Sequence, residues 1–262
     1  MDLSNKKIAL LGSSTGIGFE CALQASLLGA EVLLVARNQH NLQDARHKIT
    51  KLSKCRPDIL QIDLCDPGSE EVFKQYINSS WGGELDCLLL NSGGPSFSAQ
   101  DLDVRAATWQ NSFQSLFLSQ ILIAKFAINL MKANNFGRIV SLSSSGIIEP
   151  QVGLIVSNSI RAALAGWIKT ISMQVATHNI TLNTVVLGRV QTNRLDTIEQ
   201  NKAQQSNLPL EEFRANSISQ IPCGRYGTAE EVAHLVCFLF SDLAAYINGT
   251  SIRVDGGLIK QI

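Results

Sequence analysis

Short apolar runs alternate along the first half of this chain with longer segments of helical periodicity. The runs are IALLG at 8–12, EVLLVA at 31–36, DILQID at 58–63 and LDCLLL at 85–90. The segments between them predict helices over 17–28, 41–52 and 70–77, and a long helix that ends at Met131. Strands buried on both faces read as continuous apolar runs, and connecting helices make such strands parallel. The pattern therefore predicts a parallel sheet covered by helices on both faces.

The second half continues this alternation to the C-terminus. Apolar runs at 138–144, 180–188 and 250–254 predict strands, and helices are expected over about 156–177 and over 229–240. One doubly wound, Rossmann-like α/β domain then spans residues 1–262. The exception is 191–221, a polar segment with sparse apolar anchors. A segment of this length predicts a mobile helical flap over a substrate, or alternatively a variable surface insertion.

Charge excludes two classes of partner. The 22 Lys and Arg residues are balanced by 22 Asp and Glu residues, so the formal net charge is zero. Binding to nucleic acid or to an anionic membrane depends on an excess of positive charge, which this chain lacks. We therefore expect neither a nucleic-acid partner nor a membrane partner.

Cysteine usage and hydropathy indicate the compartment. The six cysteines stand singly, without a CxxC pair, which predicts a reduced cytoplasmic chain with no metal site. The N-terminal residues show no signal-peptide pattern. The most apolar later stretch, 116–131, is interrupted by Ser119, Gln120, Lys125 and Asn129, so it predicts a buried helix and not a membrane span.

A glycine-rich turn follows the first predicted strand. It reads Gly12-Ser13-Ser14-Thr15-Gly16-Ile17-Gly18, and the next helix begins at about Gly16. Glycines allow a sharp turn and a close approach to a diphosphate, while the helix N-terminus supplies free N–H groups and partial positive charge. We expect cofactor contacts from Gly12, Ser14, Thr15, Gly16, Ile17 and Gly18.

With this turn the chain resembles the short-chain dehydrogenases/reductases, whose motif is TGxxxGxG, although Leu11 stands at the Thr position. Further family motifs follow in order: Asp63-Leu64, Asn91-Ser92-Gly93, Leu187-Gly188 and Val254-Asp255-Gly256-Gly257. The resemblance implies that Asp63, Leu64, Asn91, Ser92 and Gly93 lie against the adenine and its ribose. It also implies cofactor contacts from Gly188, Val190 and Thr192 near the nicotinamide and diphosphate.

The end of the second strand indicates which dinucleotide is used. An acid there would favour NAD, whereas a cation favours the additional phosphate of NADP. The sequence has Arg37 at this position, so NADP(H) is favoured over NAD(H). An exposed loop arginine without a ligand is the alternative interpretation.

The catalytic positions depart from the family pattern. The family places a Ser on a strand end, a Tyr and a Lys one helical turn apart, and an Asn on the preceding long helix. The family Ser falls on Ser144, but the Tyr and Lys positions hold Ser157 and Arg161, and the Asn position falls on Leu116, with Asn111 nearby. The spacing of four residues still places Ser157 and Arg161 on one helix face.

These replacements change the chemistry that we expect. A serine hydroxyl is a weak acid and an arginine hardly releases a proton. Ser144, Ser157 and Arg161 could still polarise a carbonyl oxygen, and Arg161 could hold the nicotinamide ribose. Alternatively, Ser144 caps the strand end, Ser157 is a small helix residue, and Arg161 pairs with a carboxylate. Tyr226, after the flap, is the one tyrosine that could reach the site.

Two functions remain open. The first is an NADP(H)-dependent oxidoreductase that resembles the 3-oxoacyl-(acyl carrier protein) reductase branch and reduces a small-molecule or carrier-bound acyl substrate. The second is a catalytically impaired dinucleotide-binding regulatory or scaffold protein. The resemblance over 229–257 also implies a homo-oligomer, commonly a tetramer or else a dimer. Its apolar face of Val232, Leu235, Val236 and Leu239 forms either the interface or internal core.

Overall fold

A computed structural model describes residues 1–53, 55–95 and 101–261. Its centre is a seven-stranded sheet of order β3-β2-β1-β4-β5-β6-β7, in which every neighbouring pair is parallel. The strands are β1 Lys7–Leu11, β2 Glu31–Ala36, β3 Asp58–Gln61, β4 Cys87–Leu90, β5 Gly137–Ser144, β6 Ile180–Leu187 and β7 Ser251–Val254. The predicted doubly wound α/β fold is confirmed.

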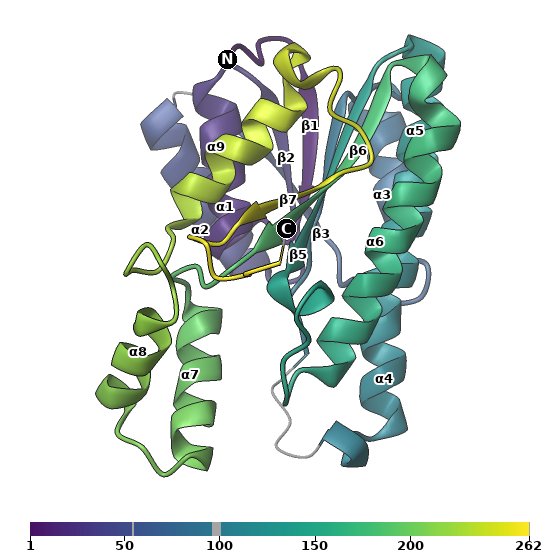
Figure 1. Ribbon diagram of the computed structural model, residues 1–262. Coiled ribbons are helices and arrows are strands. Elements are labelled where there is room, and N and C mark those ends of the chain that lie inside the picture. The colour runs from purple at the N-terminus through teal and green to yellow at the C-terminus, as the bar shows by residue number, and fades with distance from the viewer. Residues whose placement is uncertain (54, 96–100, 262) are drawn as a thin grey trace.

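Helices cover both faces of this sheet (Figure 1). They are α1 Gly16–Leu27, α2 Gln39–Ser53, α3 Ser69–Ser80, α4 Ala106–Phe113, α5 Ser119–Asn134, α6 Ile155–Val175, α7 Asn193–Gln205, α8 Leu210–Ser219 and α9 Ala229–Phe240. Helices α1, α2 and α9 share one apolar core with the sheet, and α3, α5 and α6 share the other. The expected helix ends differ by a few residues, because termini depend on local capping more than on periodicity.

The long helix that was expected to end at Met131 is divided into three parts. Helix α4 passes into a π-helical turn, Gln114–Leu118, before α5 begins. The continuous segment 106–134 is long and apolar enough to cross a membrane by length and composition alone. Ile123, Ala127 and Met131 on α5 nevertheless have no exposed surface and pack in the core between α5, α6 and the sheet. Their burial agrees with the expected buried helix.

The apolar face of α9 is internal core. Val232, Val236 and Leu239 have no exposed surface and pack in the same core as α1. Of the two interpretations that the sequence left open, the structure therefore supports the second for these residues. The expected homo-oligomer receives no support from this face and stays a prediction.

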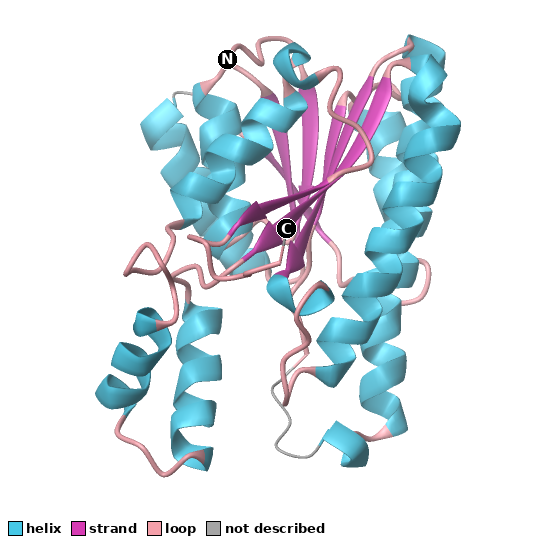
Figure 2. Cartoon of the chain, viewed as in Figure 1, coloured by secondary structure: helices cyan, strands magenta, loops and turns pink. Residues whose placement is uncertain are grey.

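The polar segment 191–221 forms helices α7 and α8, which lie beyond the carboxyl ends of the strands (Figure 2). Thr192 caps α7, because its side-chain oxygen accepts a hydrogen bond from the Leu195 N–H at 3.3 Å. Glu199 is 2% exposed and accepts a hydrogen bond from Arg214 Nε at 3.1 Å. This buried polar contact joins α7 to α8, which explains how so polar a segment forms ordered helices.

Candidate active site

The turn between β1 and α1 has a backbone that only glycine fits well. Gly12 and Gly16 have φ angles of +62° and +58°, in the left-handed region that disfavours other residues. At Gly18 a Cβ would lie 2.2 Å from the Gly12 carbonyl oxygen. Asn91, beyond β4, donates a hydrogen bond from Nδ2 to that same oxygen at 3.1 Å. The turn is therefore fixed against the end of β4.

A cavity of about 630 Å³ opens beside this turn, at the carboxyl ends of the central strands. Its lining contains the expected residues Gly12, Ser14, Thr15, Gly16, Ile17, Gly18, Arg37, Asp63, Leu64, Asn91, Ser92, Gly93 and Thr192. We call this the larger cavity. Crevices at this position in open parallel sheets bind dinucleotides. The narrow glycine turn, the N-terminus of α1 and this lining fit such a cofactor.

The larger cavity is not lined by three of the expected cofactor residues, Arg161, Gly188 and Val190. Gly188 lies where β6 passes close to the chain after β7, and a Cβ on it would be 2.6 Å from Asp255 Cα. Val190 is 6% exposed and packs in the core with α1 and α9. The structure gives Gly188 and Val190 packing roles at the base of the flap.

Arg161 is bound from three sides. Nε donates to Ser157 Oγ at 3.2 Å, Nη1 to the Leu142 carbonyl at 2.9 Å, and Nη2 to the Ser92 carbonyl at 3.4 Å. Burial, together with the positive charge of Arg194, lowers the pKa of Arg161 to about 10. Arg161 forms no ion pair with a carboxylate within the described residues. The alternative in which it pairs with an acid is therefore wrong there.

Ser144 ends β5 and caps the short turn that follows. Its Oγ accepts a hydrogen bond from the Gly146 N–H at 3.2 Å. This is the strand-end cap that the sequence offered as the alternative. The hydroxyl proton takes no part in that bond, so the same side chain retains a donor.

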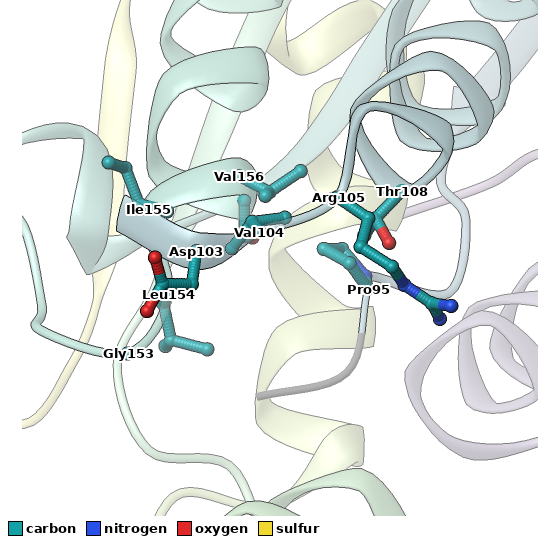
Figure 3. Close-up of a pocket in the computed structure, with 10 residues that line it drawn as sticks. Pro95, Asp103, Val104, Arg105, Thr108, Gly153, Leu154, Ile155 and Val156 are labelled. Carbon is teal, nitrogen blue, oxygen red and sulfur yellow. The ribbon is translucent and has the colours of Figure 1, made fainter. Parts of the chain in front are cut away.

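A smaller cavity of about 220 Å³ has Ser157 in its lining. Figure 3 shows nine other residues that line it. Its lining also includes Pro95, Val104, Thr108 and the residues from Gly153 to Val156. The structure thus brings Ser157 to a cavity wall and places Arg161 directly behind it. Leu116 is fully buried beside Val156 and Ile160, so the position of the family Asn supplies packing alone.

Tyr226 does not line either cavity. Its hydroxyl donates a hydrogen bond to the buried Glu199 carboxylate at 2.5 Å. Burial and this bond raise the pKa of Tyr226. Tyr226 therefore fastens the flap helix α7, and the suggestion that it reaches the site receives no support.

Sequence reasoning missed Arg194, which lines the larger cavity from the start of α7. Its guanidinium donates to the carbonyls of Gly94 and Pro95 at 3.0 and 3.1 Å. A Cβ at Gly94 would lie 2.5 Å from Arg194 Nη2. The glycine that directly follows Asn91-Ser92-Gly93 was the available signal for this contact.

Comparison with known proteins agrees with this geometry. The family model described as Enoyl-(Acyl carrier protein) reductase matches residues 12–259. The NADPH-dependent reductase BacG of Bacillus subtilis is 31% identical, over 99% of this chain and 100% of the relative. The 3-oxoacyl-(acyl-carrier-protein) reductase FabG of Rickettsia conorii is 30% identical, over 99% of each chain. A crystal structure of L-sorbose reductase from Gluconobacter frateurii, complexed with NADPH and L-sorbose, has a TM-score of 0.92 and 26% identity, covering 100% of this chain and 99% of that one.

Proposed function

Because the chain belongs to the short-chain dehydrogenase/reductase family, as an NAD(P)-dependent oxidoreductase, we propose that it uses NADP(H) to reduce a carbonyl compound. The observation that carries this proposal is the larger cavity with its glycine turn, together with a smaller cavity that has Ser157 in its lining. When bound, the cofactor supplies the hydride. Everything else in the reaction falls to side chains of this chain.

The preference for NADP(H) rests on Arg37. Its side chain lines the larger cavity directly after β2, beside Asn38 and Asn41. A guanidinium can pair with a ribose phosphate, which NADP(H) carries and NAD(H) lacks. The named relatives BacG and L-sorbose reductase are themselves described with NADPH.

Ser144, Ser157 and Arg161 form the proposed oxyanion site. Arg161 donates to Ser157 Oγ, so the Ser157 hydroxyl proton is directed elsewhere and can reach a carbonyl oxygen in the smaller cavity. The guanidinium charge behind Ser157 stabilises negative charge that develops on that oxygen. The same charge serves to hold the nicotinamide ribose. None of these groups is a tuned general acid, so simple ketones should be reduced slowly.

We propose a 3-oxoacyl-like substrate, either a small molecule or an acyl group on a carrier. The smaller cavity has apolar walls from Val104, Leu154, Ile155 and Val156, which suit a short acyl chain. We further propose that the protein works in the cytoplasm as a homo-oligomer, with 1–262 as one domain and 191–221 as its mobile substrate flap.

A substrate panel with matched variants tests this function. NADPH oxidation should be followed for wild type, Ser144→Ala and Arg161→Met against 3-oxoacyl thioesters, ketoses and cyclic ketones. Turnover that falls about 10²-fold or more in both variants would support the proposed oxyanion site. NADPH binding without turnover of any substrate would instead support the dinucleotide-binding scaffold protein. The observation that favours this alternative is that Arg161 already donates hydrogen bonds to Ser157 and to two main-chain carbonyls.

A further inference from the structure

We propose that Asp101 is a positioning residue, which holds the two walls of the smaller cavity together and fixes Ser157 between them. This role rests on the proposed function, since it assigns the smaller cavity to the substrate. Asp101 touches neither the larger cavity nor Ser157 itself. It acts through the backbone of the segment that starts α6.

The geometry is a carboxylate bridge between distant segments. Asp101 Oδ2 accepts a hydrogen bond from the Gly153 N–H at 2.9 Å, and Oδ1 accepts one from the Ile155 N–H at 3.4 Å. Asp101 begins the short 3-10 helix Asp101–Asp103, 52 and 54 residues earlier in the chain. Each carboxylate oxygen therefore accepts a hydrogen bond from a different amide in the segment that leads into α6.

Helix α6 has no cap of its own at this end. Leu154 occupies the N-cap position without a side-chain hydrogen bond, and the first turn contains no acidic residue. The first amides of a helix lack intrahelical acceptors, and negative charge is stabilising beside them. Asp101 supplies both the acceptor and the charge from outside the helix.

The bridge joins the two segments of the chain that supply most of the lining of the smaller cavity, and Figure 3 shows residues of both. Asp103, Val104, Arg105 and Thr108 follow Asp101 and form one wall, whereas the residues from Gly153 to Ser157 form the other. Ser157 lies two residues beyond Ile155, in the turn that Asp101 fixes. Loss of the bridge should widen the cavity and let Ser157 move relative to Arg161, which is held separately by Ser92 and Leu142.

The neighbouring aspartate provides a matched control. Asp103 lies on the same short helix and lines the smaller cavity. Its carboxylate makes no hydrogen bond or ion pair with the rest of the described chain. Asp103→Ala therefore removes one negative charge from the same wall without removing the bridge. Asp101→Asn keeps part of the bridge, because the amide oxygen of Asn still accepts a hydrogen bond.

Hydrogen exchange, NADPH binding and kinetics are measured on wild type, Asp101→Ala, Asp101→Asn and Asp103→Ala. In Asp101→Ala we expect exchange at the first-turn amides of α6 to rise about fivefold, as for a lost cap. NADPH affinity should stay within about twofold, because Arg161 keeps its other partners, while KM rises about tenfold. For Asp101→Asn, the exchange rate and the KM should lie between those of wild type and Asp101→Ala. Asp103→Ala should match wild type in exchange.

The outcomes separate this role from the proposed function. Unchanged exchange in Asp101→Ala would show that no such bridge positions α6. Raised exchange with unchanged kcat/KM would show that the bridge is merely structural. Absence of turnover in wild type would refute the proposed function alone, and the exchange comparison would then decide the role of Asp101 by itself.

Discussion

Replacing Arg161 by methionine should leave the fold almost as stable but weaken NADPH binding. Methionine keeps an unbranched side chain, shorter than that of arginine, while removing the charge and the donors. The hydrogen bonds to Ser157, Leu142 and Ser92 would all be lost. The stability of the variant depends on the balance between two effects. These hydrogen bonds are lost, but the free-energy cost of burying a cation is removed.

The two effects are similar in size. Burial and the nearby Arg194 lower the pKa of Arg161 to about 10, which at 1.36 kcal/mol per pKa unit corresponds to about 3 kcal/mol against the charged folded form. The hydrogen bonds that oppose this contribute about 1 kcal/mol each. The free energy of unfolding should therefore change by no more than about 1 kcal/mol, or about 2–4 °C in Tm for a chain of this size. Arg161 is then kept for its chemistry and not for stability.

Thermal unfolding with and without cofactor is the assay. NADPH at a hundred times its Kd should stabilise wild type by about 2.7 kcal/mol. If Arg161 holds the ribose, a tenfold weaker Kd at the same NADPH concentration leaves about 1.4 kcal/mol in Arg161→Met. Arg56→Met is the control, because Arg56 is exposed and lies outside both cavities.

Two results would refute this reasoning. A loss of more than about 3 kcal/mol without cofactor would mean that Arg161 stabilises the junction of β4, β5 and α6, and that the cost of burying its charge is overstated. Equal stabilisation of wild type and Arg161→Met by NADPH would mean that Arg161 does not hold the cofactor.

Other predictions concern cofactor choice, pH, the altered catalytic pair and assembly. NADPH should raise the Tm more than NADH at equal concentration, and Arg37→Ala should remove the difference; a larger rise with NADH would contradict the cofactor assignment. Because the pKa of Arg161 is lowered to about 10, its charge persists at neutral pH and is lost as the pH rises through that value. NADPH affinity in a pH titration should therefore fall there in wild type but not in Arg161→Met. The double variant Ser157→Tyr, Arg161→Lys restores a general acid and should accelerate ketone reduction by about 10²-fold or more; a double variant that binds NADPH but stays inert, beside an active wild type, would show that the roles given to Ser157 and Arg161 are wrong. Light scattering should show a homo-oligomer, and a monomer at micromolar concentration would disprove it.

The fold and the larger cavity could be predicted from the sequence because their signals are local. Apolar runs separated by helical segments specify parallel strands, and the carboxyl ends of those strands meet at one edge. The glycines at 12, 16 and 18 mark a turn that other residues fit poorly, since two have positive φ angles and the third lies against backbone. The positions of these residues relative to the predicted strands were therefore enough to identify most of the residues that line the larger cavity.

Local signals were insufficient where one pattern suits two environments. The apolar face of α9 has the same spacing whether it packs against α1 or against a second subunit, and the structure places it inside. The long apolar helix conceals the π-helical turn at Gln114–Leu118, because periodicity does not register one shifted hydrogen bond. Gly188 and Val190 were expected at the cofactor because they lie in or just after a family motif, yet they pack at the base of the flap.

The sequence by itself determined the sheet, the glycine turn and the replacement of the family Tyr and Lys by Ser157 and Arg161. Only the tertiary structure decided what those replacements contact. Arg161 meets Ser92 across 69 residues of chain, and Asp101 meets Gly153 across 52. Such partners are set by how strands and helices pack together, because a charged or polar side chain takes whichever acceptors the assembled fold presents to it.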